Sequence, residues 1–518
     1  DVGTGSARAG ILDRQGGLIG RATHPILINR PERDFAGHDS EDIWRAVSAA
    51  VRGACENAAI GGETIRGIGF DATCSLVVRD RQGAQLPLSP DDAHCWDTIA
   101  WFDHRALAEA DECTASGHAV LDTSGGVVSP EMQIPKLMWL KRNLPATWKN
   151  AGYFFDLTDF LTWKASASPA RSQCTLACKW TYLAHEDGWQ QDFFAAMGVP
   201  DLLERGRLPA QASQPGSFVG TLLPEAAQAL GLSSECRVGA GLIDAYAGML
   251  GVVGGSAKDE QATGRHLALI GGTSSCLMAM TREPRRFPGV WGPYLGAVLH
   301  GLWVSEAGQS ATGALLDHVI RWHGAGGVPD SAMHERIAGR VRELRAEEGS
   351  GFANRLHVLP DFHGNRSPLA DPHALGVVSG LALDSSFDSL CRLYWRTAVG
   401  IALGIRHILD VQKERGYVAD TLHVAGGHAR NPLLMELYAD ATGCTIVEPV
   451  VEDATLLGAG MVAATAAGLY PDLASAAAGM GRKGRELKPD PQKRQAFDRD
   501  YRIFLEMQRQ RQVLDRME

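Results

Sequence analysis

The chain has 518 residues, of which 45% are hydrophobic and 21% are charged, a composition typical of a globular protein with a large buried core. Its 50 Lys and Arg residues against 60 Asp and Glu residues give a formal net charge of −10, which argues against a nucleic-acid-binding protein, because such proteins normally present a basic face to phosphates. At about 150 residues per domain, this length predicts two or three domains.

Ten cysteines are spread along the chain, and none of them form the CxxC spacing of a zinc or redox motif. Cys174 and Cys178 have the spacing of one helix face, so we expect both to be buried apolar side chains. The sequence shows no signal peptide and no uninterrupted apolar stretch of about 20 residues, so we expect a cytoplasmic protein without membrane or nucleic-acid partners. The sequence opens at Asp1 without a methionine, and we expect a few native residues to precede it.

The first half begins with a β hairpin and a helix. Residues 9–12 and 18–20 are predicted strands around a turn at residues 13–17. Ile43, Val47 and Val51 then recur at the spacing of one helix face. Residues 65–70 form a predicted buried strand that delivers residues 71–73 to its carboxyl end.

The second half alternates strands with helices, which predicts an α/β protein. Asn431 as N-cap and Pro432 at the first helical position announce one of these helices. The other predicted elements are a strand at 267–270, a helix at 397–416, strands at 421–425 and 444–447, and a helix at 454–467 closed by Gly468.

Two loops half a chain apart share a pattern of glycine and hydroxyl residues beside a β run: residues 1–6 (DVGTGS) and 270–275 (IGGTSS). Gly-rich loops can supply backbone N–H donors to a phosphate, and Ser and Thr hydroxyls add more. Asp1 at the start of the first loop is suited to hold Mg²⁺, usually through water. The alternative is two tight hairpin turns, and neither loop is a P-loop, because no GxxxxGK[ST] sequence occurs.

The one GxGxxG match, at residues 479–484, follows a helical stretch rather than a strand. A dinucleotide fingerprint needs a strand before it and a helix after it. We therefore expect a surface turn there and exclude a Rossmann dehydrogenase. The seventeen histidines form no HExxH motif, and we expect no intrinsic zinc site.

Asp244 is a lone carboxylate in an otherwise uncharged run flanked by glycines, at residues 239–248. A charge in such surroundings is costly unless it has a partner or a function. It is either the N-cap of a helix or a general base that takes a proton from a hydroxyl.

Trp101, Asp103 and Arg105 combine a flat aromatic ring with a carboxylate and a guanidinium, the groups that sugar sites use. The alternative is an ion pair at a helix start. Lys179 and Glu306 are weaker candidates for the same site, each open to a structural role.

In their order along the chain, these pieces resemble the FGGY carbohydrate kinases, which have a two-domain actin-like α/β fold of the ribonuclease H-like superfamily, shared with hexokinase and Hsp70, with a catalytic cleft between the domains. The motifs that carry the resemblance are DVGTGSAR at 1–8, WFDHRA at 101–106, EMQIPKLMWLK at 131–141, GLIDAYAG at 241–248, GGTSS at 271–275, GQSATG at 308–313, AGGHARNPLLMELYAD at 425–440 and EDATLLGAG at 452–460.

The resemblance implies a sugar-binding N-terminal domain at 1–253, a nucleotide-binding C-terminal domain at 254–518, and ATP and Mg²⁺ as cofactors. Asp244 is implied as the catalytic base and Asp1 as the acid that coordinates Mg²⁺. The implied ATP-binding residues are Gly3, Thr4, Gly5, Ser6, Arg8, Gly272, Thr273, Gly313, Asp317, Gly426, Gly427 and Asn431. The implied substrate-binding residues are Thr73, Trp101, Asp103, Arg105, Lys179, Asp244 and Glu306.

The stretch DATCSLVV at 71–78, with WFDHRA and CKWTY, is similar to the D-ribulokinase branch of this family. We therefore expect phosphorylation of D-ribulose at its terminal hydroxyl, with ribitol, L-ribulose and D-xylulose as alternatives. A non-catalytic actin-like sensor of sugar and nucleotide and an actin-like chaperone or filament subunit are the rivals from other classes. The small-molecule sugar and ATP are the expected partners, and the sequence leaves a homodimer open.

Overall fold

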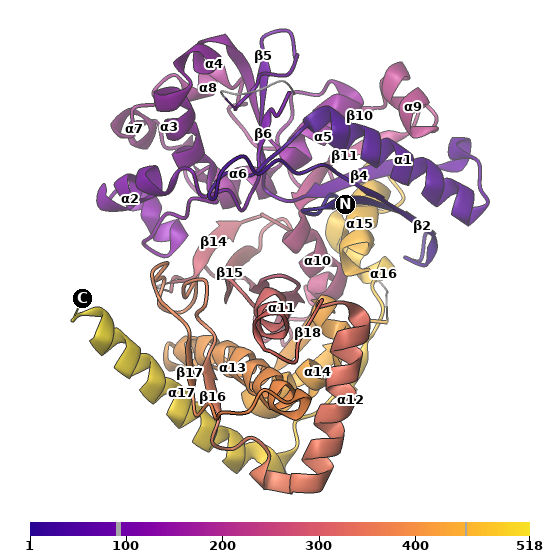
Figure 1. Cartoon of the computed structure of the whole chain (residues 1–518). Coiled ribbons are helices and arrows are strands. Elements are labelled where there is room, and N and C mark those ends of the chain that lie inside the picture. Colours follow the sequence, from indigo (N-terminus) through magenta and orange to yellow (C-terminus); the bar gives the residue numbers. More distant parts are fainter. Residues whose placement is uncertain (90–94, 288, 451–452, 518) are drawn as a thin grey trace.

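The computed structural model describes residues 1–89, 95–287, 289–450 and 453–517 (Figure 1). Glu452, the first residue of the motif at 452–460, lies outside the described residues. The first half of the chain forms the upper part of the molecule in Figure 1 and the second half forms the lower part, with α10 (Asp244–Val253) between them. Strands and helices alternate in both halves, so the α/β prediction is confirmed.

The sheet of the first half is built around the predicted hairpin, which is confirmed as β1 (Ser6–Leu12) and β2 (Leu18–Pro25). Its turn is closed by Asp13, whose Oδ1 accepts hydrogen bonds from the N–H groups of Gln15 and Gly17, both at 2.8 Å. On the far side, β4 (Gly67–Ala72) pairs with β11 (Arg237–Ile243) in parallel, and β10 (Phe218–Thr221) follows. Residue 71 lies inside β4, so this strand extends two residues beyond the predicted end.

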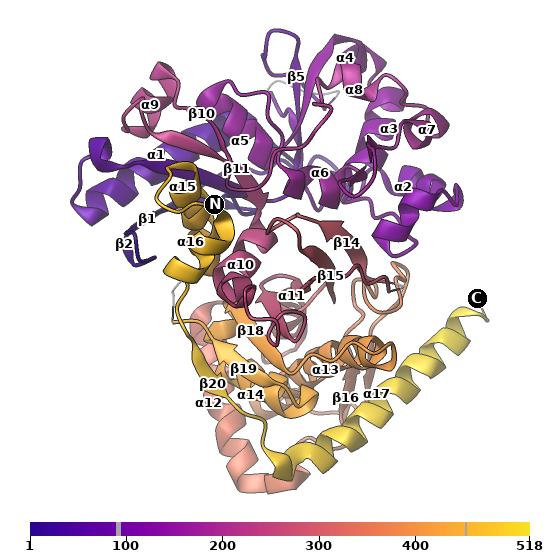
Figure 2. The ribbon, with the colours of Figure 1, turned by 180° about the vertical axis from the view of Figure 1, so that it is seen from behind.

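Two helices from distant parts of the chain cover this sheet. The predicted amphipathic helix is confirmed as α1 (Ser40–Ala58), with Ile43, Val47 and Val51 buried. The helix α15 (Ala454–Ala466), from the second half, packs against β4 and β11 and against α10. It lies beside the N-terminus in Figures 1 and 2.

A smaller α/β layer follows β4, and it occupies the top of Figure 1. Its sheet has the order β3 (Gly37–His38), β6 (Thr98–Ile99), β5 (Leu76–Asp80) and β7 (Ala151–Asp156). Its other elements are α2 (Leu107–Ala115), α3 (Gln133–Asn143), α4 (Pro145–Asn150), α6 (Gln173–Lys179), β8 (Tyr182–Leu183), β9 (Gly188–Trp189), α7 (Gln191–Ala196) and α8 (Leu202–Arg205). Two further helices of this half, α5 (Leu157–Ser166) and α9 (Pro224–Leu230), share the core of α1: α5 packs against β11 and α9 packs against α1. Cys174 and Cys178 are buried in α6, as predicted.

The second half holds a seven-stranded sheet, with the order β14 (Trp291–Leu295), β15 (Trp303–Gln309), β13 (Ser275–Thr281), β12 (His266–Gly271), β18 (Thr421–Gly426), β19 (Thr445–Glu448) and β20 (Arg485–Leu487). Around it lie α11 (Gly313–Trp322), α12 (Ser331–Glu348), the hairpin of β16 (His357–Leu359) and β17 (Val377–Ser379), α13 (Phe387–Glu414), α14 (Pro432–Thr442), α16 (Leu473–Met480) and α17 (Arg494–Asp515). Among the described helices, none is both long enough and apolar enough to span a bilayer.

The local predictions for this half are largely confirmed. Asn431 caps α14, because its side chain accepts from the N–H groups of Leu433 and Leu434 (3.1 and 3.4 Å). α13 begins ten residues before the predicted start, because Ser386 caps it and the buried stripe continues upstream. The GxGxxG match begins in the last two residues of α16 and ends just before β20, so a helix precedes it and a strand follows it, the reverse of the order in a dinucleotide fingerprint.

The similarity between the two loops has a structural counterpart. In the second half, β12 runs antiparallel to β13 and parallel to β18. In the first half, Val2 makes the same two kinds of pairing, antiparallel to Ala7 of β1 and parallel to Ala72 of β4. Each loop therefore lies where a chain leaves the middle of a sheet and turns into the neighbouring antiparallel strand.

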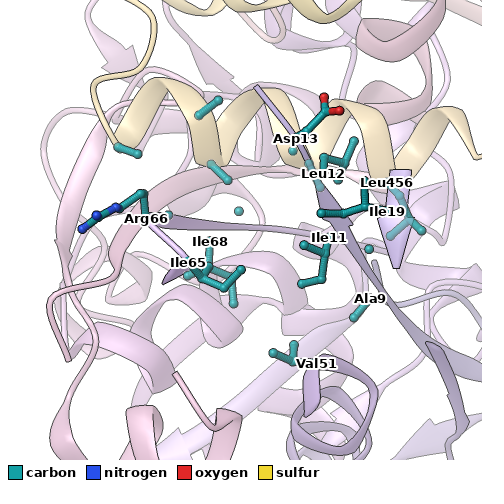
Figure 3. A pocket seen from close by; sticks show the side chains of 18 of the residues that line it. Ala9, Ile11, Leu12, Asp13, Ile19, Val51, Ile65, Arg66, Ile68 and Leu456 are labelled. Atoms are coloured by element: carbon teal, nitrogen blue, oxygen red, sulfur yellow. The ribbon is translucent and has the colours of Figure 1, made fainter. Parts of the chain in front are cut away.

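Beyond Val2, a cavity of about 290 Å³ separates β1 from β4 (Figure 3). Ile11, Ile68 and Val51 line it on one side and Leu456 of α15 on another, so apolar side chains face it from both helices that cover the sheet. Asp1 lies at its edge and exchanges two backbone hydrogen bonds with Arg8 (2.8 and 3.0 Å). A segment attached ahead of Asp1 would continue the pairing of Asp1 with β1 and run between β1 and β4 in this cavity.

We expect an apolar extension at the N-terminus to stabilise the protein. A chain preceded by Val-Leu-Ala-Leu would continue the pairing of Asp1 along β1 and place apolar side chains in the cavity. Burying two leucine-sized side chains should raise the free energy of unfolding by about 2 kcal/mol or more. Urea unfolding measures the change, and an extension Ser-Lys-Ser-Lys is the control. Equal stability of the two extended chains would contradict this prediction.

Candidate active site

Asp244 lies where β11 passes directly into α10. The N-cap residue of α10 is Ile243, so the interpretation of Asp244 as a helix N-cap is wrong: it is the first residue within the helix. Its carboxylate accepts a hydrogen bond from the N–H of the next residue, Ala245 (2.7 Å). Burial raises the pKa of Asp244, while Arg8 and Lys179 act in the opposite direction. A carboxyl group in this position can exchange a proton with a bound hydroxyl.

The glycines around Asp244 serve helix packing. A Cβ on Gly251 of α10 would lie 2.1 Å from the carbonyl oxygen of Ala454, and one on Gly458 of α15 would lie 2.1 Å from that of Ala247. The two helices therefore touch through bare backbone, and larger residues would push Asp244 away from the acidic groups beside it.

Those acidic groups gather at the first loop. Arg8 pairs with Asp1 (Nη2 to Oδ2, 2.5 Å) and lies 3.7 Å from Asp453, which also lies 3.4 Å from Arg21. Asp71 is fully buried, and burial raises its pKa to about 7, with the nearby Asp244 acting in the same direction. Asp1 Oδ1 and both carboxyl oxygens of Asp71 lack a hydrogen-bond donor, and the ammonium group of Asp1 lies 3.8 Å from Asp71 Oδ2. Buried carboxylate oxygens without donors are the ligands that a hard cation such as Mg²⁺ takes, so these residues fit the metal that the sequence predicts.

The first loop is a tight turn, in which the N–H of Gly3 donates to the carbonyl of Ser6 (3.0 Å). Gly5 adjoins this turn, and its carbonyl accepts from the N–H of Ile26 (3.1 Å). The hydroxyl of Thr4 accepts from the indole N–H of Trp101 (3.0 Å), so the ring predicted to contact sugar is tied to the loop predicted to contact phosphate.

The second loop is held by the start of α11. The N–H of Gly313 donates to the carbonyl of Gly272 (3.0 Å), and the N–H of Thr312 donates to that of Thr273 (2.9 Å). A Cβ on Gly313 would lie 2.4 Å from the carbonyl oxygen of Gly272, so only glycine allows this approach. Gly272 and Thr273 are both exposed, as a loop that receives a ligand must be.

Asp317 and Asn431, both predicted at the nucleotide, belong to one network. Asp317 Oδ1 lies 3.0 Å from His334 Nε2, and His334 Nδ1 lies 2.9 Å from the hydroxyl of Tyr394. That hydroxyl also accepts from the side-chain amide of Asn431 (3.2 Å). Gly426, at a positive φ of 81°, and Gly427 lie at the end of the adjacent β18.

Glu306 lies at the centre of a second, buried cluster to which both halves contribute. Its carboxylate accepts from the hydroxyl of Tyr246 (2.8 Å), and it forms an ion pair with Arg366. Burial alone would raise the pKa of Glu306, but the charges of Arg366 and Lys179 hold it below its usual range. A negative oxygen beside two cations can bind hydroxyl groups in a fixed orientation.

Lys179 closes this cluster from the first half. Its Nζ lies 4.3 Å from the ring centroid of Trp291 and 4.0 Å from Glu131, and its side chain is 4% exposed. Arg366 lies 4.0 Å from the same Trp291 ring. The two cations Lys179 and Arg366 thus flank the Trp291 ring, and both act on the charge of Glu306. A part for Lys179 and Glu306 in sugar binding stays a prediction.

Asp103 and Arg105 are mainly engaged with each other. The carboxylate of Asp103 accepts from the guanidinium of Arg105 (2.7 Å to Nη2) and from the N–H of Ala36 (2.5 Å). Arg105 also lies 4.3 Å from the Phe35 ring centroid. This is the geometry of the ion-pair alternative, and a direct part for either residue in sugar binding stays a prediction.

Thr73 donates its N–H to the carbonyl of Val2 (3.0 Å), and its hydroxyl lies 3.2 Å from that of Ser75. The hydroxyl of Ser75 accepts from the N–H of Trp101 (3.1 Å). The stretch at 71–78 thus links the first loop to the aromatic residue at the sugar side.

Sequence reasoning did not single out Asp71, Asp453, Tyr246, Trp291 or Arg366 as site residues. Asp71 had a usable signal, since it is a carboxylate directly after the predicted buried strand at 65–70, and its backbone contacts Val2 of the first loop. No signal in the sequence points to Trp291 of β14 or to Arg366, which lies before β17, because both reach Glu306 only through tertiary packing.

Family comparison covers most of the chain. Residues 1–251 match the N-terminal domain, and residues 267–467 the C-terminal domain, of the FGGY family of carbohydrate kinases. The chain is 43% identical over 538 residues to an FGGY carbohydrate kinase domain-containing protein of Danio rerio, covering 100% of this chain and 98% of that protein. It is 36% identical over 510 residues to a D-ribulokinase of Saccharomyces cerevisiae, covering 90% of this chain and 71% of that protein.

The fold is that of solved sugar kinases. The crystal structure of a xylulose kinase from Rhodospirillum rubrum superposes with a TM-score of 0.77 at 22% identity, covering 98% of this chain and 96% of that chain. The two-domain actin-like fold expected from the sequence is thereby confirmed.

We expect the Glu306–Arg366 pair to behave as a unit in stability. Arg366→Met should lower the free energy of unfolding by about 3 kcal/mol, because the buried carboxylate then lacks its cation. Glu306→Gln combined with Arg366→Met should cost clearly less than the sum of the single changes, because no charge is left unpaired.

Urea unfolding followed by tryptophan fluorescence measures these effects. Arg509→Met is the control, because Arg509 is 64% exposed and pairs with Glu506 on the surface of α17, and it should leave the curve unchanged. Strictly additive effects of Glu306→Gln and Arg366→Met would show that the two residues are not coupled.

Proposed function

The chain belongs to the FGGY family of carbohydrate kinases, and we propose that the substrate of this ATP-dependent sugar kinase is a pentulose, D-ribulose, which it converts to D-ribulose 5-phosphate. Asp244 is the observation that carries the proposed chemistry. The charges of Arg8 at the first loop and of Lys179 and Glu306 in the buried cluster all act on its pKa, which supports a carboxyl group near both the expected phosphate and the expected sugar.

In the proposed reaction, Asp244 accepts the proton of the terminal hydroxyl as that oxygen attacks the γ-phosphorus of ATP. The bond from the γ-phosphorus to the bridging oxygen breaks, and ADP leaves. Glu306 and Lys179 orient the sugar, and Trp101 closes the sugar side against the first loop. Catalysis then comes mainly from positioning and from charge stabilisation.

The nucleotide would lie across the second half of the chain. Gly272 and Thr273 offer exposed backbone beside the phosphates, with the half-buried Gly313 next to them, and Gly426 and Gly427 offer bare backbone to the adenosine. Asp1, with Asp71 beside it, would hold Mg²⁺, which when bound neutralises charge on the phosphates. Arg8 and the turn at residues 3–6 would lie near the γ-phosphate.

The choice of D-ribulose has two supports. One is the identity of 36% to the yeast D-ribulokinase, and the other is the stretch DATCSLVV, which links the first loop to Trp101. Ribitol, L-ribulose and D-xylulose remain the alternatives, because they differ from D-ribulose only in the arrangement or oxidation of hydroxyl groups.

We further propose a division of work at residues 253/254, with sugar bound mainly before it and nucleotide after it. The positions of Trp101 and Lys179 support sugar binding before residue 254, and the second loop supports nucleotide binding after it. Glu306 reaches the sugar side from the second half. A cytoplasmic location and a homodimer stay predictions of the sequence.

Substrate preference is tested by ADP release with Mg²⁺ and ATP against D-ribulose, L-ribulose, D-xylulose, ribitol and glycerol. We expect kcat/KM for D-ribulose to exceed the others by roughly tenfold or more, a difference of about 1.4 kcal/mol in barrier. Preference for another of these compounds would support the proposed kinase activity and contradict the choice of D-ribulose as its substrate. ATP and sugar binding without any turnover would favour the sensor.

Asp244→Asn tests the base. Removing a general base should lower kcat by at least about 100-fold, because the attacking hydroxyl keeps its proton. Binding of ATP, measured by calorimetry, should stay close to normal, because the amide keeps the shape of the carboxyl group. Asp187→Asn changes an exposed aspartate in the turn before β9 and is the matched control. Normal turnover of Asp244→Asn would remove Asp244 from the mechanism.

A further inference from the structure

His428 is a buried imidazole at the meeting point of three segments that the proposed function assigns to ATP. It is 3% exposed and lies in the short helix η5 (Gly427–Arg430), directly after the glycine pair at the end of β18. The second loop and the start of α11 are the other two segments. The proposed chemistry gives this side chain no role.

Both ring nitrogens of His428 are engaged. Nε2 lies 3.2 Å from the carbonyl oxygen of Gly272 and 3.3 Å from the hydroxyl of Thr312, and Nδ1 lies 2.8 Å from the hydroxyl of Tyr438. A carbonyl oxygen can only accept, so we assign the ring proton to Nε2 and let Nδ1 accept from Tyr438. Burial lowers the pKa of His428 to about 4, which keeps this neutral form at neutral pH.

The ring also packs on bare backbone. A Cβ on Gly271, at the end of β12, would lie 2.2 Å from Nδ1 of His428, so this position has room only for glycine. Gly271 pairs with Gly426 of the neighbouring strand β18, and a Cβ on Gly426 would lie 2.4 Å from the carbonyl oxygen of Gly271. The imidazole thus sits against the ends of two parallel strands.

The Gly272 carbonyl is where the three segments join. It accepts from the N–H of Gly313 at 3.0 Å as well as from His428. Thr312 adds a second link, since its hydroxyl lies 2.9 Å from that of Ser275, at the other end of the loop. Loss of the His428 proton donor would free one side of this junction.

We propose that His428 is a positioning residue for the nucleotide: through Nε2 it holds the Gly272 carbonyl and the Thr312 hydroxyl, and so sets the second loop and the α11 start relative to the glycine pair of β18. This inference rests on the proposed binding of ATP at these segments. The contact to Tyr438, on the other side of the ring, ties His428 to α14, and the hydroxyl of Tyr438 also interacts with Ser275 at the end of the second loop.

Two substitutions distinguish the roles of the two ring nitrogens of His428. His428→Gln can place an amide donor near the position of Nε2, and His428→Asn can place an acceptor near the position of Nδ1. We expect His428→Asn to raise KM for ATP by roughly tenfold and to leave KM for the sugar within about twofold, because the loop loses its buried donor. His428→Gln should stay within about threefold of the parent in both constants.

Affinity for the non-hydrolysable analogue AMP-PNP, measured by calorimetry, should follow the same order without turnover. His423→Ala is the matched control, because His423 lies on β18 and contacts His266 (3.1 Å) rather than the second loop. Equal effects of Asn and Gln at position 428, or a change mainly in KM for the sugar, would overturn the proposal. Each variant's melting temperature shows whether it is folded.

A second pair keeps the test decisive if His428→Asn does not fold. Thr312→Val removes the hydroxyl beside Nε2 and is compared with His423→Ala, which changes a histidine that contacts His266 rather than the second loop. We expect only Thr312→Val to raise KM for ATP, and equal effects would again overturn the proposal. Absence of ATP binding and turnover in the parent protein would instead refute the proposed function itself.

Discussion

The contact of α15 with the first half of the chain depends on glycines, which have no side chain to keep the backbones apart. A Cβ on Gly67 or Gly69 of β4 would come within 2.4 Å of a carbonyl oxygen of α15, and Gly251 and Gly458 remove the same conflict between α10 and α15. This close packing joins a helix from the end of the chain to the sheet at its start. It also brings Asp453, which caps α15, to within reach of Arg8 and Arg21. The excess of glycine in the composition, 59 residues, is therefore partly a requirement of the site and not only of turns.

Charge is distributed unevenly over the site, and the distribution follows the proposed chemistry. At the first loop, Asp1 Oδ1 and both carboxyl oxygens of Asp71 have no hydrogen-bond donor, which is costly unless a further cation binds there. In the buried cluster around Glu306, Arg366 and Lys179 balance the carboxylate, so it stays ionised without a metal. Asp244 lies between these two environments with a raised pKa, the condition under which a carboxyl group can take up a proton and release it again.

Local signals in the sequence predicted the elements well, and long-range contacts limited the rest. The hairpin closed by Asp13 and the cap at Asn431 were predictable, because each depends on a few neighbouring residues. The start of α13 was missed, because Ser386 is a weaker signal than the apolar stripe that follows it. Arg366 and Trp291 could not be found, because no local pattern relates them to Glu306. For Asp103 and Arg105 the sequence offered two interpretations, and only the coordinates show that the two side chains are occupied with each other.

The two similar loops differ in the side chains that lie beneath them, and this difference supports a different role for each loop in the proposed function. The first loop rests on carboxylates and on Arg8, so it is the side suited to a metal-bound phosphate. The second rests on a neutral imidazole, two hydroxyls and backbone, through His428, Thr312 and Ser275. A neutral support adds no repulsion to an anionic ligand and can hold a carbonyl in one orientation without attracting a cation. Similar backbone pairing in the two halves thus supplies two similar loops, and under the proposed function the buried side chains below each loop decide which one recruits the metal and which one positions the nucleotide.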